Sequence, residues 1–570
     1  MDTLHIHTER LDDVPLLYSQ LEKMGIRELV DRYFPAHGNW KGSSPGLVTT
    51  CWLIHLVSQA DHRLKYVEDW ASEHRETLHL LSGQYIEPVE VNDDRLARLL
   101  EWFSDDAAWG SFQTDLNRRL LVSYALPCDT VRHDSTTVSR YTATAQEGLI
   151  QLGHSKDHRP DLGQLNVMLS TLDPLALPVS VAVVDGSRAD DPLYLPAIQR
   201  VRASLGAGLL HVGDSQMACQ ATRAQIVAGG DDYLCPLPVL QREDWEVYLA
   251  PVHAGTIPLL PISAPSVDGS SSSIAEGDTR HVTMTVDMDE TVIAWTERQL
   301  VVRSFAYATS QERALKKRVA AAGAALDRLL LRKQGKHRPQ SLLDCHAAVD
   351  QILKEHAVAQ VLDVTCEEHL THTHLRAYKD RPARTVTTST FTLTHQVNEA
   401  ALNKAVDALG WRIYATSATE QRLSLPQAVT EYRCEYRIEQ GFSRLKGRSL
   451  SLKPMYLQRD DHRVGLVRLL LLALYLLTLV QYQVRRELDT QHDELTGLYG
   501  NLTTARPTTE RLLQSFRQIH LTMITTTTQE TSTHITPLTP VQIQILTLLK
   551  IDPNVYQFQK PIKFQKPIKK

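Results

Sequence analysis

Cysteines are few in this sequence, and none stands in a closely spaced pair. The seven cysteines of the 570-residue chain are scattered without a CxxC motif. An odd, unpatterned set is typical of reduced thiols, so we expect a cytoplasmic protein without disulfides. Cys366 lies close to His369, His372 and His374, but the crowded spacing and the missing second cysteine disfavour a zinc site there.

Long apolar runs are also scarce. The one membrane-like run, LLLLALYLLTLV at 469–480, is shorter than the ~20 residues that a spanning helix needs. Arg468 and Gln481 bound this run, so it predicts a buried helix and no membrane association. The polar opening MDT predicts that no signal peptide is present.

Neither sign of charge dominates, and the glycines at 206–208 are too few for a nucleotide-binding loop. With a net charge of −5, any affinity for nucleic acid has to come from local patches. Between 432 and 468, Arg and Lys outnumber Asp and Glu. Such a cluster is more often a solvated face than a binding surface. The length predicts about two to four domains.

The first 120 residues predict a helical domain. Ser44 precedes a proline and a run with helical periodicity, and Asn92 precedes acidic residues. Both arrangements are typical helix starts. No helix rich in Arg and Lys stands out, so a helical domain that only packs against the rest of the chain remains open.

Residues 126–240 predict strands and one helix. TVRHDSTTVSR carries Asp134, and LNVMLSTL and VSVAVV are β-rich segments joined by a turn at Asp173. After a helix at 193–205, LLHVGD leads to Asp214. Three strands, a helix and a fourth strand follow the order of an RNase H-like core. Asp134 and Asp214 would then stand at strand ends, where a capping role is the ordinary one for an aspartate.

Residues 241–415 predict an insertion with strands such as HVTMTVDMD, TVIAWTERQLVVRS and RTVTTSTFTLTH, and a helix near 309–332. The Ser-rich piece at 267–278 predicts a surface loop. Trp295 is expected to be buried, in preference to stacking on a displaced nucleic-acid base.

The stretch YRCEYRIEQGFSRLKGR carries the strongest chemical signal. If one helix starts at Ser424 and stops at Gly447, seven-residue spacing places Tyr432, Glu439 and Lys446 on one stripe. A carboxylate between a tyrosine and a lysine, in a basic segment, suits a group that holds a metal ion next to phosphates.

The last segment, 486–570, is less informative. TMITTTTQETSTHITPLTP predicts a linker or an edge strand, and TPVQIQILTLLK predicts a short capped helix. FQKPIK then occurs twice in a basic tail broken by prolines, which predicts disorder.

The spacing of Tyr432, Glu435, Glu439 and Lys446 resembles the Tyr-Arg-Glu-Lys signature of DDE transposases encoded by bacterial insertion sequences. Glu435 stands where that signature has arginine. HDST, GHSKDHRPDLGQL and VVDGSRADD also look like the corresponding stretches of these transposases, and ERLDDVPLLYSQLEKMGIRELVDRYF looks like their N-terminal domain. The match after Asp214 is looser.

The resemblance implies an α/β architecture: an RNase H-like catalytic core interrupted by a β-rich insertion domain and preceded by a helical N-terminal domain. The implied segments are 1–120 (helical, DNA-binding or dimerising), 126–240 (core, first part), 241–415 (insertion), 416–485 (core, second part, with the catalytic helix) and 486–570 (C-terminal segment with the basic tail).

The resemblance also implies a catalytic site. Asp134, Asp214 and Glu439 would hold two Mg²⁺ ions, for which Mn²⁺ can substitute. Carboxylate oxygens suit these hard cations, and DNA phosphate supplies the remaining ligands. The expected DNA contacts come from Tyr432, Arg433, Arg437, Arg444, Lys446 and Arg448.

The implied function is that of a DNA transposase, which cleaves the ends of an element and joins them to target DNA. Its partners would be double-stranded DNA with terminal inverted repeats, target DNA and a second copy of the chain, on the nucleoid in the cytoplasm. An RNase H-like nuclease without strand transfer is one alternative. A decayed copy that only binds DNA is another, which Glu435 keeps open. We expect Glu435→Arg to leave cleavage intact or to raise it.

Overall fold

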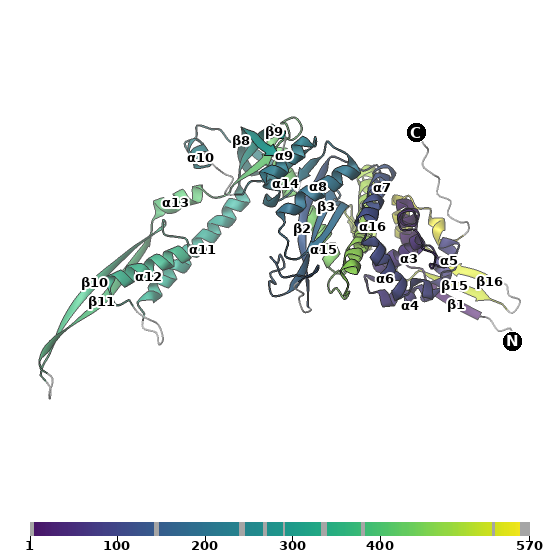
Figure 1. Ribbon diagram of the computed structural model, residues 1–570, viewed down its shortest axis with the longest axis horizontal. Helices are drawn as coiled ribbons and strands as arrows, with labels where there is room; N and C mark the ends of the chain where they lie inside the picture. The colour runs from purple at the N-terminus through teal and green to yellow at the C-terminus, as the bar shows by residue number, and fades with distance from the viewer. Residues whose placement is uncertain are drawn as a thin grey trace.

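A nine-stranded mixed sheet lies at the centre of the computed structural model (Figure 1). Its strands are β2 (Thr130–Arg140), β3 (Gly163–Leu172), β4 (Leu177–Asp185), β5 (Leu210–Val212), β6 (Asp232–Pro236), β7 (Leu260–Pro265), β8 (Ser271–Met288), β9 (Thr291–Ser304) and β12 (Trp411–Thr416). Their order across the sheet is β4-β3-β2-β5-β6-β12-β9-β8-β7. The structure describes residues 5–141, 147–238, 245–265, 271–288, 291–331, 339–377, 382–526 and 531–558.

The half of the sheet from β4 to β6 contains the four predicted strands, β2 to β5, and also β6, which the sequence analysis did not predict. β2, β3 and β4 are antiparallel neighbours, and β5 and β6 run parallel to β2 on its other side. The helix α8 (Asp191–Leu205) connects β4 to β5, and α9 (Gln220–Ala228) connects β5 to β6. β3 is buried along its whole length, as expected for an inner strand of a sheet that helices cover.

Strands from the 241–415 segment extend the same sheet. β12 pairs with β6 and with β9, both antiparallel. The loop expected at 267–278 is wrong from Ser271 onward, because there the chain runs in β8, which pairs with β7 from Ser271 and with β9 from Ala275. Residues 266–270 lie outside the described residues. Trp295 is buried as predicted, and its indole N–H donates a hydrogen bond to the Tyr233 hydroxyl at 2.9 Å.

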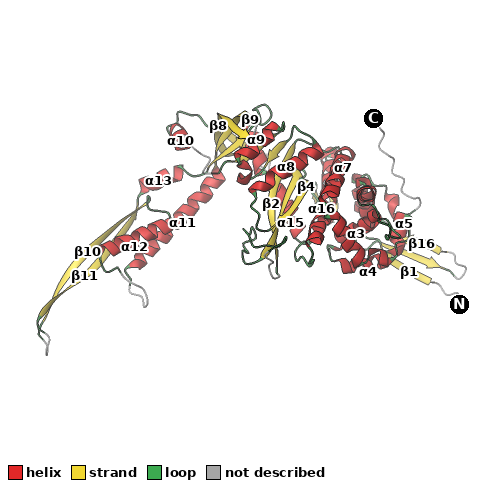
Figure 2. Cartoon of the chain, viewed as in Figure 1, coloured by secondary structure: helices red, strands yellow, loops and turns green. Residues whose placement is uncertain are grey.

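The rest of this segment forms an arm that projects away from the body, on the left of Figure 1. In the arm, helices lie beside a pair of strands (Figure 2). The elements of the arm are α11 (Phe305–Leu329), α12 (Leu342–Glu355), β10 (Leu362–Leu375), β11 (Arg384–Val397) and α13 (Glu399–Asp407). The helix α10 (Trp245–His253) belongs to the same segment of the chain but lies near the sheet. The arm has its own apolar cluster, to which Leu326, Val349 and Leu362 belong.

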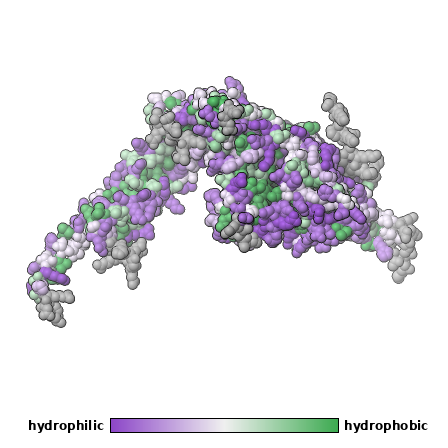
Figure 3. All heavy atoms as spheres, in the orientation of Figure 1, coloured by the Kyte–Doolittle hydropathy of each residue, from purple (hydrophilic) through white to green (hydrophobic). Residues whose placement is uncertain are grey.

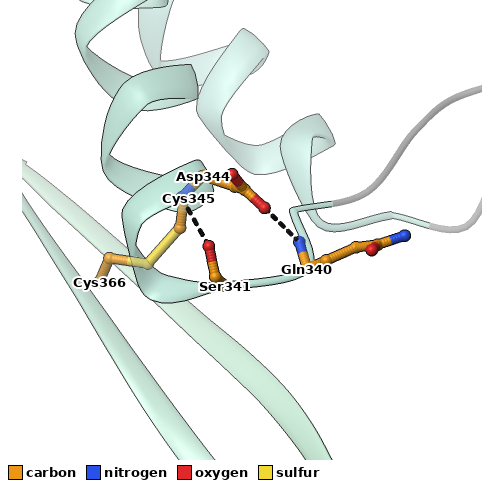
Figure 4. The surroundings of a disulfide bond; sticks show 5 residues. All are labelled: Gln340, Ser341, Asp344, Cys345 and Cys366. Carbon is orange, nitrogen blue, oxygen red and sulfur yellow. Dashed lines mark hydrogen bonds between the residues drawn. A yellow bond between two sulfur atoms is a disulfide. The ribbon is translucent and has the colours of Figure 1, made fainter.

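A disulfide between Cys345 and Cys366 joins α12 to β10 (Figure 4). The expectation that every cysteine is reduced is therefore wrong for this pair. The two cysteines are 21 residues apart in the sequence and meet only because the helix packs on the strand, so no motif marks them. With its sulfur in this bond, Cys366 does not act as a thiolate ligand for a metal.

The N-terminal part is helical as predicted, except at its start. Ser44 and Asn92 each cap a helix with their side chains. Residues before the first helix form the strand β1 (His5–Arg10), which pairs with β15 (His520–Thr525) from the Thr-rich segment. This long-range pairing is invisible to local sequence patterns. The helices are α1 (Val14–Met24), α2 (Ile26–Tyr33), α3 (Pro45–Gln59), α4 (Val67–Glu73), α5 (Arg75–Ser82), α6 (Asp93–Phe103) and α7 (Asp106–Tyr124).

The helix α16 (Asp460–Gln491) joins these helices to the sheet. It is long and apolar enough to cross a membrane, but its most apolar 18-residue window, with a mean hydropathy of 2.1, is 89% buried inside the fold. A helix that is apolar on all sides belongs in a core, as predicted for 469–480. At Gly465 a Cβ atom would lie 2.1 Å from the backbone oxygen of Leu100, so only glycine permits this approach to α6.

The C-terminal part covers the other side of α16. Thr539 begins the last helix with a capping box, as predicted. Most of the FQKPIK tail, 559–570, lies outside the described residues. The elements are β13 (Leu495–Tyr499), β14 (Leu502–Thr504), α17 (Thr509–Gln514), β16 (Thr531–Ile535), which pairs with β15, and α18 (Pro540–Leu548).

Candidate catalytic site

Asp134 and Asp214 belong to neighbouring parallel strands and lie at the same level. β2 and β5 pair in register, from Thr130 opposite Leu210 to Arg132 opposite Val212. If this register is continued by two residues past Arg132 and Val212, Asp134 lies beside Asp214. Asp214 follows the end of β5 as predicted, whereas Asp134 lies in the middle of β2, because β3 continues to pair with β2 beyond it.

The Asp134 carboxylate is largely buried, with 22% of its side chain exposed. It accepts a hydrogen bond from the backbone N–H of Ser135 at 2.7 Å. The ammonium group of Lys156 lies 3.7 Å from it and 3.0 Å from Asp190. Burial raises the pKa of Asp134 to about 7, against the opposing charge of Lys156. At neutral pH additional positive charge at this position would therefore ionise the carboxyl.

Asp214 has two hydrogen-bond donors that fix its orientation. The backbone N–H of Gln216 donates to it at 2.9 Å, and the hydroxyl of Tyr194, from α8, donates at 2.6 Å. Burial and the Asp214 charge raise the pKa of Tyr194, so the phenol remains a donor. The capping role that sequence reasoning allowed for Asp214 is present, and it leaves the carboxylate at the edge of the sheet beside Asp134.

The predicted catalytic helix is two helices. α14 (Leu425–Arg433) begins at Ser424 with a capping box, and α15 (Tyr436–Lys446) ends at Gly447, both as predicted. Residues 434–435 form a turn between them. The turn interrupts the helical repeat on which the seven-residue spacing depended.

The predicted stripe is therefore wrong at its first member. Tyr432 lies in α14 with only 9% of its surface exposed. Its ring packs on Tyr414 of β12, with the centroids 4.8 Å apart. Glu439 and Lys446 remain together on α15, which packs against β2.

Glu435 and Glu439 both lie at the start of α15, one helical turn apart. Burial raises the pKa of Glu435, and the charges of Glu439 and Asp214 add to the effect. Glu435 in turn contributes to the raised pKa of Asp134. Glu439 is exposed. The residue that departs from the signature is thus the glutamate in electrostatic contact with both aspartates, a role that sequence reasoning missed.

Lys446 connects α15 to the strand that carries Asp134. Its ammonium group donates to the Thr136 hydroxyl at 2.8 Å and lies 3.2 Å from the Asp157 carboxylate. Lys453 also pairs with Asp157. The HSKDH stretch thus supplies both Lys156, next to Asp134, and Asp157, which positions Lys446.

The four arginines expected to contact DNA have separate surroundings. Arg433 and Arg448 are exposed, and Arg433 donates to the Ser304 hydroxyl at 3.1 Å. Arg437 lies 3.2 Å from Asp173, and Arg444 lies 2.9 Å from Glu510. The charges of Arg437 and Arg444 are thus already paired within the fold.

A buried ion network links α14 and the start of α15 to the sheet. Arg132, on β2, is 2% exposed and contacts Asp173 at 2.6 Å and Glu431 at 2.7 Å. Arg437 completes the network through the same two carboxylates. Opposite charges that share hydrogen bonds in this way hold α14 and α15 against β2 and β3.

Two buried histidines form a second chain of contacts beside the aspartates. Nε2 of His133 lies 2.9 Å from Nδ1 of His211, and Nε2 of His211 lies 3.2 Å from Asp231. Burial lowers the pKa of both histidines, so the pair is neutral near pH 7. The only sequence signal for this pair is a histidine close before each aspartate, in RHD and HVGD.

A pocket of about 500 Å³ opens beside Asp214, between the sheet and the base of the arm. Tyr432, Trp411 and Arg412 contribute to its lining. The Arg412 guanidinium lies over the ring of Tyr307, 4.2 Å from its centroid. The lining thus combines aromatic side chains and a guanidinium beside the Asp214 carboxylate.

The carboxylates of Asp134, Asp214, Glu435 and Glu439 are the type of donor that Mg²⁺ or Mn²⁺ prefers. Burial, with a further contribution from neighbouring carboxylates, raises the pKa values of Asp134 and Glu435, and a divalent cation would offset both effects. Among the residues that the structure describes, however, no group of three or more His, Cys, Asp or Glu side chains is arranged to hold a metal ion. The fit to a divalent cation thus lies in the chemistry of the carboxylate donors and in the adjacent placement of Asp134 and Asp214.

Comparison with known proteins gives limited assignments. Residues 6–109 match the family described as "Domain of unknown function (DUF4277)". No curated protein matches the chain. A cryo-EM structure of a piggyBac transposase synaptic complex with hairpin DNA is similar with a TM-score of 0.32 and 6% identity, over 90% of this chain and 81% of that one. A similarity at this level does not establish a shared fold, so the functional argument rests on the site itself.

Proposed function

We propose that the chain is a DNA transposase of the DDE type, with an RNase H-like core that cleaves DNA ends and transfers them by phosphoryl transfer. The observation that carries the proposal is the level placement of Asp134 and Asp214 on adjacent parallel strands, within the order β4-β3-β2-β5-β6. We assign the further carboxylate to the start of α15, where Glu435 interacts electrostatically with Asp214 and with Glu439. The transposase signature around Glu439 and the HSKDH stretch support the same assignment.

Asp134 and Asp214, with Glu439 or Glu435, would hold two Mg²⁺ ions. When bound, these ions would activate the attacking oxygen and stabilise the leaving oxygen at the scissile phosphate. Tyr194 keeps Asp214 in place, and the Arg132 network holds the α14–α15 turn against the sheet.

The proposed partner is double-stranded DNA with terminal inverted repeats, bound by a pair of chains. Arg433 and Arg448 are exposed for phosphate contact, and the pocket beside Asp214 has room for an unpaired nucleotide. Lys156 supplies positive charge beside Asp134, where a strand end would approach.

The proposal is tested by cleavage of a DNA fragment that carries the terminal repeats flanking the gene, with Mg²⁺ and with EDTA. Glu439→Gln and Glu435→Gln are compared with wild type, and Glu399→Gln serves as the matched control, because Glu399 is an exposed glutamate in the first turn of α13. We expect metal-dependent cuts at the repeat ends, which disappear in the variant that lacks the third carboxylate. End-specific cutting that survives in both glutamine variants would refute this site.

A decayed transposase that only binds DNA is the second candidate. It is favoured by the acidic Glu435 in the arginine position and by the lack of a ready group of three metal ligands among the described residues. Repeat binding without cleavage by wild type would establish it. Glu435→Arg separates the two: restored cleavage means that Glu435 disables the site, and lost cleavage means that Glu435 belongs to it.

A further inference from the structure

The ribbon of β10 and β11 has an inner half that the arm supports. The disulfide of Cys366 ties β10 to α12, and Nε2 of His395, on β11, lies 2.9 Å from Asp327 of α11. Val364 and Leu393 pack against the apolar cluster of the arm. This half is thus fixed in direction by two helices.

The outer ribbon, which we define as residues 369–377 and 382–390, has no such support. Every one of its strand residues is exposed except Val386, which is half-buried. It lies at the end of the arm farthest from the body (Figure 1). An isolated pair of strands is at best marginally stable in water, so a ribbon held out in this way gains from a binding partner.

The composition of the outer ribbon is polar and free of acidic residues. Asp363, Glu367 and Glu368 lie in the inner half, whereas the outer ribbon carries Arg376 and Arg384 and no Asp or Glu. Six threonines, one serine and three histidines supply hydrogen-bonding groups, namely Thr371, Thr373, Thr385, Thr387, Thr388, Thr390, Ser389, His369, His372 and His374.

Cross-strand bonds order these side chains. His372 lies 3.0 Å from the Thr387 hydroxyl, and His374 lies 2.9 Å from the Thr385 hydroxyl. The histidines and their threonine partners project from one face of the ribbon, because alternate residues of a strand share a face. The outer ribbon thus presents a defined polar surface.

We propose that the outer ribbon is a DNA-binding element that enters the major groove of duplex DNA away from the cut, an inference that rests on the proposed function. A two-stranded ribbon fits the width of this groove. Its paired strand residues, 369–375 and 384–390, extend over about 24 Å at ~3.4 Å per residue and would cover several base pairs. Arg376 and Arg384 are complementary to phosphate, and the face that carries His372, His374 and their threonine partners would contact the base edges.

A second copy of the chain fits this surface less well. Protein interfaces have an apolar centre, but the exposed large apolar residues of the outer ribbon, as defined, are Leu370 and Leu375 alone, which are 58% and 42% exposed. They have opposite parity along one strand and therefore lie on opposite faces. Figure 3 accordingly shows no continuous apolar surface on the far part of the arm.

Two variants of the full chain test the proposal. The first removes residues 369–390 and joins Glu368 to Phe391 through Asn-Gly, since these two residues are directly opposite in the ribbon and this dipeptide closes two-residue hairpins. The second is Arg376→Gln with Arg384→Gln. Its matched control is Arg313→Gln with Arg318→Gln, two exposed arginines of α11. Fluorescence anisotropy measures affinity for a long repeat-end duplex and for a short duplex limited to the cleavage position. Single-turnover kinetics measure cleavage of the short duplex, and light scattering measures the oligomeric state.

We expect the shortened variant to bind the long duplex at least tenfold more weakly and to bind and cut the short duplex as wild type does. The double glutamine variant should lower the salt dependence of long-duplex binding by about two counterions, and the α11 control should not. Equal long-duplex affinity of wild type and the shortened variant would overturn the inference while the proposed function stands. Conversion of a wild-type dimer to a monomer with unchanged DNA affinity would identify a self-association ribbon instead. A wild type that binds no duplex overturns both proposals.

Discussion

The strands β3 and β10 both come from segments predicted to favour strands, and they have opposite surroundings. Both contain Val, Leu and Thr, but β10 also carries three acidic residues and three histidines, whereas β3 has none of either. β3 is buried at every position, whereas β10 is exposed from Glu367 to its end. β3 lies between β2 and β4 in a sheet that helices cover, whereas β10 has β11 as its one strand neighbour.

The difference shows that β-propensity predicts that a segment forms a strand, but it does not predict whether other strands and helices bury that strand. In the core, covering strands and helices lower solvent access, so carboxylates there interact strongly and their pKa values shift. In the outer ribbon, side chains remain hydrated and available for contact. We therefore expect chemistry and pH dependence in the core, and recognition in the ribbon.

The largest expected effect is the loss of cleavage on removal of a core carboxylate. Asp214→Asn keeps the shape of the side chain and loses its charge, so cleavage should fall by about 10⁴-fold, or about 5 kcal/mol of transition-state stabilisation. Single-turnover cleavage of a repeat-end duplex measures it. Asp350→Asn, an exposed aspartate of α12, is the control in the arm. Activity of Asp214→Asn within tenfold of wild type would remove Asp214 from the site.

The next effect is on core stability. Arg132→Met leaves Asp173 and Glu431 without their closest buried partner, which should cost about 3–4 kcal/mol. In the arm, Lys316→Met breaks an exposed pair with Glu312 at 2.6 Å and should cost less than about 0.5 kcal/mol. Hydrogen exchange in β2 and α11 measures both values in their own regions. Similar losses from the two substitutions would contradict the contrast between core and arm.

A smaller effect concerns pH. The pKa of Asp134 is raised from 3.8 to about 7 in the folded protein, so the folded state binds this proton more tightly than the unfolded state. Ionisation of Asp134 therefore lowers the free energy of unfolding. This loss is complete above about pH 7 and disappears as the pH falls towards 4.

Asp134→Asn removes this cost. Without metal, the variant should be more stable than wild type by about 2–3 kcal/mol near pH 8 and no more stable near pH 4. Thermal denaturation in EDTA at both pH values measures the difference, and adding Mg²⁺ should stabilise wild type more than the variant. A difference that does not change with pH would show that Asp134 is not the titrating group.

The smallest effect is confined to the arm. Cys345→Ser removes the disulfide to Cys366 and should lower the local stability of β10 by about 2 kcal/mol. The melting temperature of the central sheet should stay unchanged. Hydrogen exchange of β10, with Cys128→Ser as the control for an exposed free cysteine, measures it. Loss of protection in β2 or β3 would show that arm and core unfold together.

Much of the framework was predictable because its signals are local. Ser44, Asn92, Ser424 and Thr539 begin helices as expected, since a capping side chain acts within one turn. The strands around Asp134 and Asp214 were also predicted, as was the buried apolar helix at 469–480. Of the candidate site, the placement of Asp134 and Asp214 was therefore predictable, because both aspartates depend on these strands.

The sequence by itself determined the helix starts, the strand-forming segments, the apolar helix and the two aspartates as candidates. Only the tertiary structure decided that β1 pairs with β15, that Cys345 meets Cys366, that a turn divides α14 from α15, and that Glu435 acts on both aspartates. Caps, periodicity and turns act between neighbours in the chain. Strand partners, disulfides and the coupling of buried charges depend on which distant residues the fold brings together.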